Sequence, residues 1–207
     1  MQIMFNAVRD QFGNECTAFV HNAGLFLGVT TDPSEMQPNA RDADFDQKWD
    51  YYQKVYPQAF KRGLLLALNC TGLKHVLAIS GPGCNATSAP RVAYEDPGQA
   101  KAAMEFLVRV HASALACKGI NVNCVIPGVV KTEAWDRMEE ELAKLTDAVA
   151  TPLSTRPEHV AKSSPAHRWG EAIEVGEVVA FLCSAKGSFV TGVALPVDGG
   201  LHLQHGP

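Results

Sequence analysis

A glycine-rich motif near the middle of the chain has the residue types of a phosphate-binding turn. Residues Gly81-Pro82-Gly83-Cys84-Asn85-Ala86 match the pattern G-x-G-x-x-A directly after the apolar run His75–Ser80. A dinucleotide fingerprint must also open a helix, whose amino-terminal N–H groups hold the pyrophosphate. Here Pro90 and Arg91 continue in loop-like sequence, and the next helix signal comes at Pro97. We therefore interpret the motif as a tight turn and not as a cofactor loop.

The six cysteines form no pattern of metal or redox chemistry. No pair is spaced C-x-x-C, and none has zinc-ligand spacing with a histidine, so the sequence predicts no metal site. Cys16, Cys124 and Cys183 lie in apolar runs, where cysteine behaves as a small hydrophobe. We expect reduced thiols in a soluble protein of a reducing compartment, either the cytoplasm or an organelle stroma or matrix.

Composition limits the class of protein. The 207 residues are 46% hydrophobic and 19% charged, which is typical of one globular domain with a buried core. The net charge of −4 leaves no basic surface for nucleic acid or an anionic membrane. No apolar run reaches the roughly 18–20 residues that span a bilayer, so we expect no transmembrane segment.

Helical and buried-strand patterns alternate along the chain. Apolar runs without polar alternation predict strands, and apolar residues at helical spacing predict helices. The predicted strands are 16–20, 75–80, 120–126 and 193–197, and the predicted helices are 3–12, 49–69 (bent at Pro57), 97–118, a helix capped by Thr132, and 175–182. This order indicates an α/β fold, in which helices cover both faces of a parallel sheet.

Ligands of such sheets bind beyond the carboxyl ends of the strands. Three segments follow the predicted strands at that edge: Asn22–Gly24, Ser80–Gly83 and Pro127–Thr132. They carry amide, hydroxyl and glycine residues, and we expect them to lie together.

Four motifs in register resemble those of the short-chain dehydrogenase/reductase family. His21-Asn22-Ala23-Gly24 is similar to its strand-end motif, and His75–Ser80 to the strand before its catalytic serine. Residues 120–132 are similar to its strand, Pro-Gly turn and threonine, and the segments 168–182 and 190–200 to its carboxyl-terminal signature. The resemblance runs from residue 1 to about residue 202. It implies a Rossmann-like three-layer parallel sheet.

The resemblance implies hydride transfer between NAD or NADP and a small-molecule carbonyl or alcohol substrate. In the family a tyrosine is the general acid/base, a lysine lowers its pKa and holds the nicotinamide ribose, and a serine positions the substrate oxygen. Lys101 matches the lysine, but Pro97 stands at the tyrosine position, and Tyr94 is the candidate replacement. Ser80 lies one residue before the serine register, which falls on Gly81.

The resemblance also assigns cofactor contacts. Tyr56 stands where the family has an asparagine that supports a water relay. The matching cofactor positions are Lys101 with Asn22, Ala23 and Gly24 near the ribose, and Pro127, Gly128, Val130 and Thr132 near the nicotinamide carboxamide.

The beginning of the family's fold has no counterpart in the chain. The family opens with two βα units and a glycine-rich pyrophosphate loop, and residues 1–20 contain no such loop. We expect an N-terminally truncated single domain that lacks roughly 60–70 residues of the fold, since each βα unit is long. The strand at 16–20 is then an exposed edge. Residues 133–169 are the predicted substrate lid.

Three functions stay open at this point. The first is a divergent oxidoreductase, whose 207-residue chain need not be active alone. The second is a non-catalytic scaffold or assembly subunit, that is, a pseudoenzyme. The third is non-redox chemistry as in the related halohydrin dehalogenases, which place an arginine where this chain has Lys101. We also expect a homo-oligomer, or a partner subunit, to pack on the helices 49–69 and 97–118.

Overall fold

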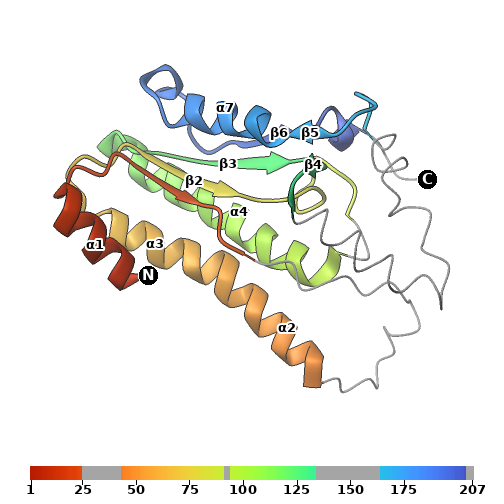
Figure 1. The fold of residues 1–207 in the computed structure, drawn as a ribbon, viewed down its shortest axis with the longest axis horizontal. Helices are drawn as coiled ribbons and strands as arrows, with labels where there is room; N and C mark the ends of the chain where they lie inside the picture. Colours follow the sequence, from red (N-terminus) through yellow and green to blue (C-terminus); the bar gives the residue numbers. More distant parts are fainter. Residues whose placement is uncertain (25–42, 91–93, 134–163, 204–207) are drawn as a thin grey trace.

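The computed structural model describes residues 1–24, 43–90, 94–133 and 164–203. Four parallel strands form the central sheet in the order β1-β2-β3-β6 (Figure 1). They are β1 (Ala18–His21), β2 (His75–Ile79), β3 (Asn121–Pro127) and β6 (Ala194–Val197). The predicted α/β fold with a parallel sheet is confirmed.

Helices cover both faces of the sheet, so the molecule has three layers (Figure 1). One face carries α1 (Gln2–Phe12), α2 (Ala43–Gln53), α3 (Ala59–Ala67) and α4 (Glu95–Leu115), and the other carries α7 (Ala172–Leu182). The short strands β4 (Val130–Lys131) and β5 (Gly170–Glu171) pair beside the carboxyl end of β3. The chain also makes single 3-10 turns: η4 (Ala116–Lys118), η6 (Ala185–Gly187) and η7 (Leu201–Leu203).

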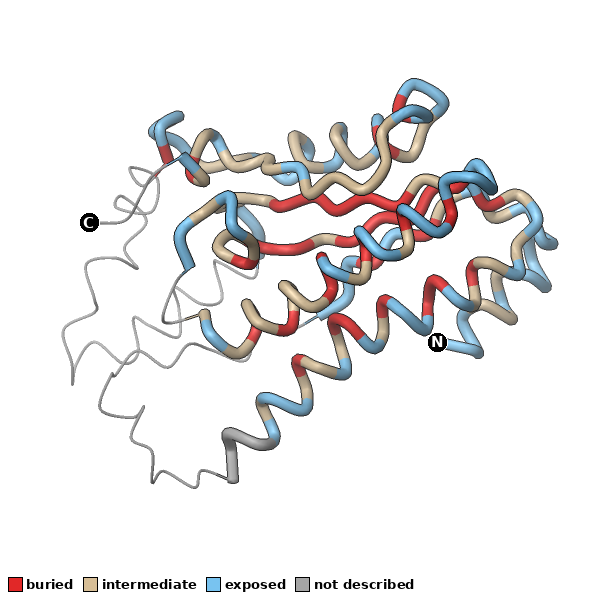
Figure 2. The backbone as a smooth tube through the Cα atoms, turned by 180° about the vertical axis from the view of Figure 1, so that it is seen from behind, coloured by how far each residue is buried: buried red, intermediate tan, exposed pale blue. Residues whose placement is uncertain are grey.

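The two faces of the sheet are packed unequally. Between the sheet and α2–α4 lies the larger core, in which Phe60, Leu64, Met104 and Val122 are fully buried. The α7 face has a smaller buried cluster of Leu77, Val125 and Leu182. Figure 2 shows the buried residues concentrated on β2, β3 and the helix surfaces that face them. The helices that carry the site therefore stand on the better packed face.

Several predicted boundaries were wrong. β1 begins at Ala18, α2 begins at Ala43, and α4 begins at Glu95, with Tyr94 as its N-cap residue. Pro97 thus lies in the third helical position. The first four N–H groups of a helix have no partner within it, so a proline is tolerated there. The predicted end of this helix at Gly119 is confirmed after η4, because Gly119 has a φ of 70°.

At Pro57, where the sequence predicts a bend, the structure has a π-turn, η2 (Lys54–Gln58), between α2 and α3. Proline has no N–H to donate to the preceding turn, and its ring crowds the carbonyl four residues earlier. The chain widens by one residue to avoid this clash. Such single π-turns occur frequently at functional sites.

Some predictions fall outside the described residues. Most of the predicted lid at 133–169 and the helix after Thr132 lie there. Within the described part, β1 is at the edge of the sheet, and its Val20 is 39% exposed. No helix in the described ranges is both long and apolar enough to cross a membrane.

Candidate functional site

Lys101 lies on α4 with its side chain directed at the carboxyl end of β2. Its Nζ donates a hydrogen bond to the main-chain carbonyl of Ser80 at 3.0 Å. Burial lowers the pKa of the Lys101 ammonium, while Cys84, Cys124 and Glu105 act in the opposite direction. A buried ammonium has three donors to satisfy. Among the described residues, the structure shows one acceptor for the Lys101 ammonium, the Ser80 carbonyl.

Tyr94 brings its hydroxyl to the same place. A Cβ atom on Gly81 would lie 2.9 Å from Tyr94 Oη and 3.4 Å from Lys101 Nζ. The phenol and the ammonium therefore meet over Gly81, where a side chain would force the phenol to move. Tyr94 is the N-cap residue of α4 and precedes Lys101 by seven residues, about two helical turns, so both lie on the same side of the helix. The Lys101 Nζ lies 5.9 Å from the centre of the Tyr94 ring.

Ser80 is held by α4 at two points. Its carbonyl accepts from Lys101, and its hydroxyl donates to the carboxylate of Glu105, one turn further along the helix. The Asn85 amide donates to the other Glu105 oxygen at 2.7 Å. Ser80 is only 3% exposed. The structure thus places Ser80 at the site with its hydroxyl committed to Glu105, and Gly81 is the residue that faces Tyr94 and Lys101.

Glu105 is a functional candidate that the sequence reasoning missed. The side chain is 5% exposed, and both carboxylate oxygens accept hydrogen bonds. A signal was available, because Glu105 follows Lys101 by four residues and so shares its helix face. When a charged residue lies on a helix face that otherwise carries small and apolar side chains, it indicates a polar partner in the core.

Tyr56 covers Lys101 from the side of β1. The Lys101 Nζ lies 5.0 Å from the centre of the Tyr56 ring. A Cβ atom on Gly24 would lie 2.9 Å from Tyr56 Oη, so only glycine fits at that position. Burial, with smaller effects of neighbouring tyrosines, raises the pKa of Tyr56 to about 12. Tyr56 is therefore a neutral phenol that touches two predicted cofactor contacts.

The thiols near the site stay protonated. Burial raises the pKa of the Cys84 thiol to about 11, although Lys101 opposes the shift. Burial also raises the pKa of Cys124 far above its usual range. A thiol is nucleophilic only as the thiolate. Neither cysteine is thus a nucleophile at neutral pH, and the described residues contain no His/Cys/Asp/Glu group that could hold a metal.

The predicted carboxamide turn follows β3 at the same edge of the sheet. Pro127 ends β3, and β3 runs parallel to β2 with Val125 paired to Ile79. Gly128 packs so closely against Asp198 that a Cβ would lie 2.6 Å from the Asp198 Cα. Val130 lies in β4, and Thr132 is exposed. Asn22 and Ala23 are likewise exposed, beyond the end of β1.

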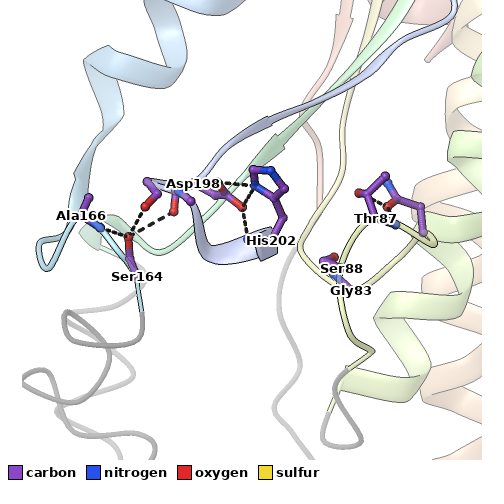
Figure 3. A network of polar contacts seen from close by, with 10 residues as sticks. Gly83, Thr87, Ser88, Ser164, Ala166, Asp198 and His202 are labelled. Carbon is purple, nitrogen blue, oxygen red and sulfur yellow. Dashed lines mark hydrogen bonds and ion pairs between the residues drawn. The ribbon is translucent and has the colours of Figure 1, made fainter. Parts of the chain in front are cut away.

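A second polar cluster follows β6. The Asp198 carboxylate accepts from the main-chain N–H groups of Gly200 and His202 and pairs with His202 Nδ1 at 3.0 Å. The Ser164 hydroxyl donates to the Gly199 carbonyl at 2.8 Å. Figure 3 shows these contacts. They close the carboxyl-terminal turn onto the segment at 164–166.

The glycine motif is a turn, as predicted. Residues 82–88 are turns and bends, and Gly83 has a φ of 81°. The Gly83 N–H donates to Ser88 Oγ at 2.8 Å (Figure 3), so it is not available for a phosphate. The Asn85 side chain caps Thr87 and also reaches Glu105. The loop 83–90 lines a cavity of about 480 Å³.

Comparisons with known proteins agree on one family. The family described as enoyl-(acyl carrier protein) reductase matches residues 1–202. The chain is 40% identical over 90 residues to diacetyl reductase [(S)-acetoin forming] of Staphylococcus epidermidis, covering 44% of the chain and 34% of that protein. It is 27% identical over 206 residues to 3-oxoacyl-[acyl-carrier-protein] reductase FabG of the same organism, covering 97% and 72%.

Solved structures show the same fold. L-sorbose reductase from Gluconobacter frateurii, complexed with NADPH and L-sorbose, is 24% identical with a TM-score of 0.76, covering 97% of the chain and 71% of that structure. YwfH, an NADPH-dependent reductase involved in bacilysin biosynthesis, is 20% identical with a TM-score of 0.74, covering 97% and 72%.

Proposed function

Because the chain belongs to the short-chain dehydrogenase/reductase family, we propose that it is a divergent oxidoreductase that transfers hydride between NAD(P)(H) and a small carbonyl or alcohol substrate. The observation that carries this proposal is the meeting of the Tyr94 phenol and the Lys101 ammonium over Gly81. A phenol beside a fixed cation is the pair that proton transfer to a carbonyl oxygen needs. The pair persists although the family's tyrosine position is Pro97.

The residues at the strand ends fit the nicotinamide end of the cofactor. Lys101 is a buried ammonium whose acceptor in the described chain is one carbonyl, so it has donors to spare for ribose hydroxyls. The other residues that would hold the nicotinamide end of the cofactor are Asn22, Ala23, Gly24, Pro127, Gly128, Val130 and Thr132. When bound, the nicotinamide supplies or accepts the hydride. The NADPH named with both solved relatives favours NADP(H) over NAD(H).

Tyr94 is the proposed general acid. A phenol has a usual pKa of about 10, and the neighbouring Lys101 ammonium favours the phenolate that remains after the proton leaves. The Tyr94 Oη thus gives its proton to the carbonyl oxygen during reduction and takes it back during oxidation. Because burial lowers the pKa of Lys101, we expect this support to be lost at a lower pH than an exposed lysine would allow.

The substrate class follows from the relatives. Their names specify a diacetyl reductase and a 3-oxoacyl reductase, so a ketone beside a second carbonyl is the first class to test. The cavity beside the 83–90 loop offers space next to Asn85 and Cys84. Ser80 would act here by holding Lys101 and the loop, since its hydroxyl already donates to Glu105.

One observation favours the non-catalytic alternative. The family's serine register falls on Gly81, where a side chain would press against Tyr94 and Lys101. The chain would then keep the fold as a scaffold or assembly subunit. The two proposals differ in whether nicotinamide nucleotides bind and whether Tyr94 matters for turnover.

A kinetic experiment separates the two. Reduction of diacetyl and of a 3-oxoacyl thioester is followed by NADPH or NADH oxidation for the wild type, Tyr94→Phe and the control Tyr51→Phe. We expect Tyr94→Phe to lower kcat by about 100-fold or more, because a general acid contributes that much, while Tyr51→Phe matches the wild type. Undiminished turnover by Tyr94→Phe would reject Tyr94 as the acid. Absence of nucleotide binding and turnover in the wild type would favour the scaffold.

We also propose that a second copy packs on α3 and α4. Leu65, Phe106 and Val110 are large apolar residues exposed on these neighbouring helices. Clustered exposed apolar side chains mark interaction surfaces. Sedimentation velocity should show a dimer or larger oligomer for the wild type and a shift to monomer for Phe106→Ser. A monomeric wild type would contradict this proposal.

A further inference from the structure

Tyr56 stands between two groups that are expected to hold the same part of the cofactor. Its ring lies 5.0 Å from the Lys101 Nζ, and its hydroxyl lies against Gly24 at the end of β1. Lys101 and Gly24 are the contacts assigned to the region of the nicotinamide ribose. A ligand that touched both would meet the Tyr56 side chain, which is 7% exposed and fills that space.

The fold holds Tyr56 in this position. Tyr56 lies inside the π-turn η2, next to Pro57. His21, at the end of β1, bonds to the Val55 carbonyl through Nε2 at 2.9 Å. Since a carbonyl only accepts, Nε2 carries the hydrogen, and burial lowers the pKa of His21 and favours this neutral ring. The hydrogen bond ties the π-turn to β1, which leads into the segment that carries Gly24.

Tyr52 supports the ring from its other side. The two rings stack with centroids 5.9 Å apart and planes 5° apart, and Tyr52 is fully buried. The face of a tyrosine ring is electronegative, so it attracts the Lys101 ammonium. The attraction of the ring for the ammonium and the stacking of Tyr52 together keep Tyr56 over Lys101.

We propose that Tyr56 sets how readily a nicotinamide nucleotide reaches Lys101. With the ring over the ammonium the site is closed, and the ring must turn away from Lys101 and Gly24 for the nucleotide ribose to bind. This inference rests on the proposed function. It assigns to Tyr56 a role in cofactor access that differs from the proton transfer assigned to Tyr94.

The cover over Lys101 is tested first without any nucleotide. The chain is acetylated with limiting acetic anhydride, and the rates at Lys101 and at Lys54 are read by peptide mass spectrometry. Lys54 is the internal reference, because its side chain is 66% exposed. The variants are Tyr56→Asn, which removes the ring, Tyr56→Leu, which keeps an apolar side chain, and the control Tyr51→Asn on α2. Thermal unfolding establishes that each variant is folded.

We expect the rate at Lys101 to rise about tenfold in Tyr56→Asn and Tyr56→Leu relative to the wild type, because a lysine reacts only where its amine is accessible. The rates at Lys54, and all rates in Tyr51→Asn, should stay at wild-type values. If Tyr56→Asn fails to fold, the result for Tyr56→Leu decides. An unchanged rate at Lys101 in a folded Tyr56 variant overturns the inference.

Nucleotide binding is measured next by NADPH and NADH fluorescence. We expect Tyr56→Asn to lower Kd by about tenfold, which is 1.4 kcal/mol, and Tyr51→Asn to leave Kd unchanged. Saturable binding by the wild type with the same Kd in the folded Tyr56 variants overturns the inference and leaves the proposed function intact. Binding by no form, with acetylation of Lys101 raised, instead overturns the proposed function and excludes the nucleotide as the occupant.

Discussion

Two buried polar clusters lie at the carboxyl edge of the sheet, and they differ in how fully their hydrogen bonds are used. Around Asp198, the carboxylate accepts from Gly200, His202 and the His202 ring, all within four residues. Around Lys101, the partners come from β2, the 81–90 loop and α4, and the buried ammonium has a single carbonyl acceptor in the described chain.

The difference separates a turn from a site. The bonds of the Asp198 carboxylate are local, as expected of a turn that closes on itself. The Lys101 cluster joins distant segments and keeps donors in reserve, and its groups have shifted pKa values. Perturbed groups brought together in this way indicate function more than burial does alone.

The largest expected effect comes from filling the space above Gly81. In Gly81→Ala, the new Cβ would lie 2.9 Å from Tyr94 Oη and 3.4 Å from Lys101 Nζ, so the phenol must move. We expect kcat/KM to fall by about 100-fold, since small displacements of catalytic groups cost that much. The measurement is steady-state reduction of diacetyl with NADPH.

Gly98→Ala is the matched control. Its Cβ would meet the Tyr94 ring at 3.3 Å, a milder contact than the 2.9 Å to Tyr94 Oη at Gly81. Alanine also has the higher helix propensity. An equal fall in kcat/KM for Gly81→Ala and Gly98→Ala would contradict a special role for the space above Gly81.

The second prediction compares how much the Glu105 and Asp198 carboxylates contribute to the free energy of unfolding. Glu105→Leu leaves the buried Ser80 hydroxyl and the Asn85 amide without their acceptor, and we expect a loss of about 2–4 kcal/mol in the free energy of unfolding. Asp198→Asn keeps an oxygen that accepts from main-chain N–H groups, and we expect about 1 kcal/mol. Urea denaturation measures both.

Glu105→Gln distinguishes lost hydrogen bonds from lost packing, because it keeps the shape and one acceptor. Its loss should fall between the wild type and Glu105→Leu. A larger loss of unfolding free energy for Asp198→Asn than for Glu105→Leu would contradict the difference between the two clusters.

The smallest effect lies on the surface near the second cluster. Arg168 donates both guanidinium nitrogens to Glu174 at 2.8 and 2.6 Å, and Glu174 also accepts from the Glu171 N–H. These contacts lower the pKa of Glu174 to about 2. The pair lies on the surface, so its contribution is small and screened by salt.

The sign of its pH dependence follows from the lowered pKa. The stabilisation is present above the unfolded pKa of about 4.3 and is lost as the pH falls toward about 2. The unfolding midpoints of wild type and Glu174→Gln should therefore differ slightly at pH 6 in low salt and converge at pH 2. A difference that grows as the pH falls would contradict this assignment.

The sequence predicted the layers and the parallel order because buried strands and alternating helices leave a strong pattern. It predicted a disturbance of the helix at Pro57, and the structure has the π-turn η2 there. The start of α4 was misplaced because Asp96-Pro97 is a good cap signal, whereas proline is equally tolerated two positions later.

The site was only partly predictable. Tyr94 and Lys101 were assigned from the family resemblance, and the structure brings them together. The partner of Ser80 could not be read from the sequence, because the Ser80–Glu105 contact depends on how α4 crosses β2. The position of Tyr56 over Lys101 likewise depends on the π-turn and on His21, which are tertiary features.

The most direct test of the central claim is the affinity of NADPH for the wild type and for Lys101→Met, measured by titration calorimetry. Methionine keeps the length of the buried side chain and removes its charge and donors. If Lys101 is a reserved ammonium for the nicotinamide ribose, the wild type binds saturably, and Lys101→Met raises Kd by about tenfold or more. Equal affinity in the two folded proteins would contradict that role.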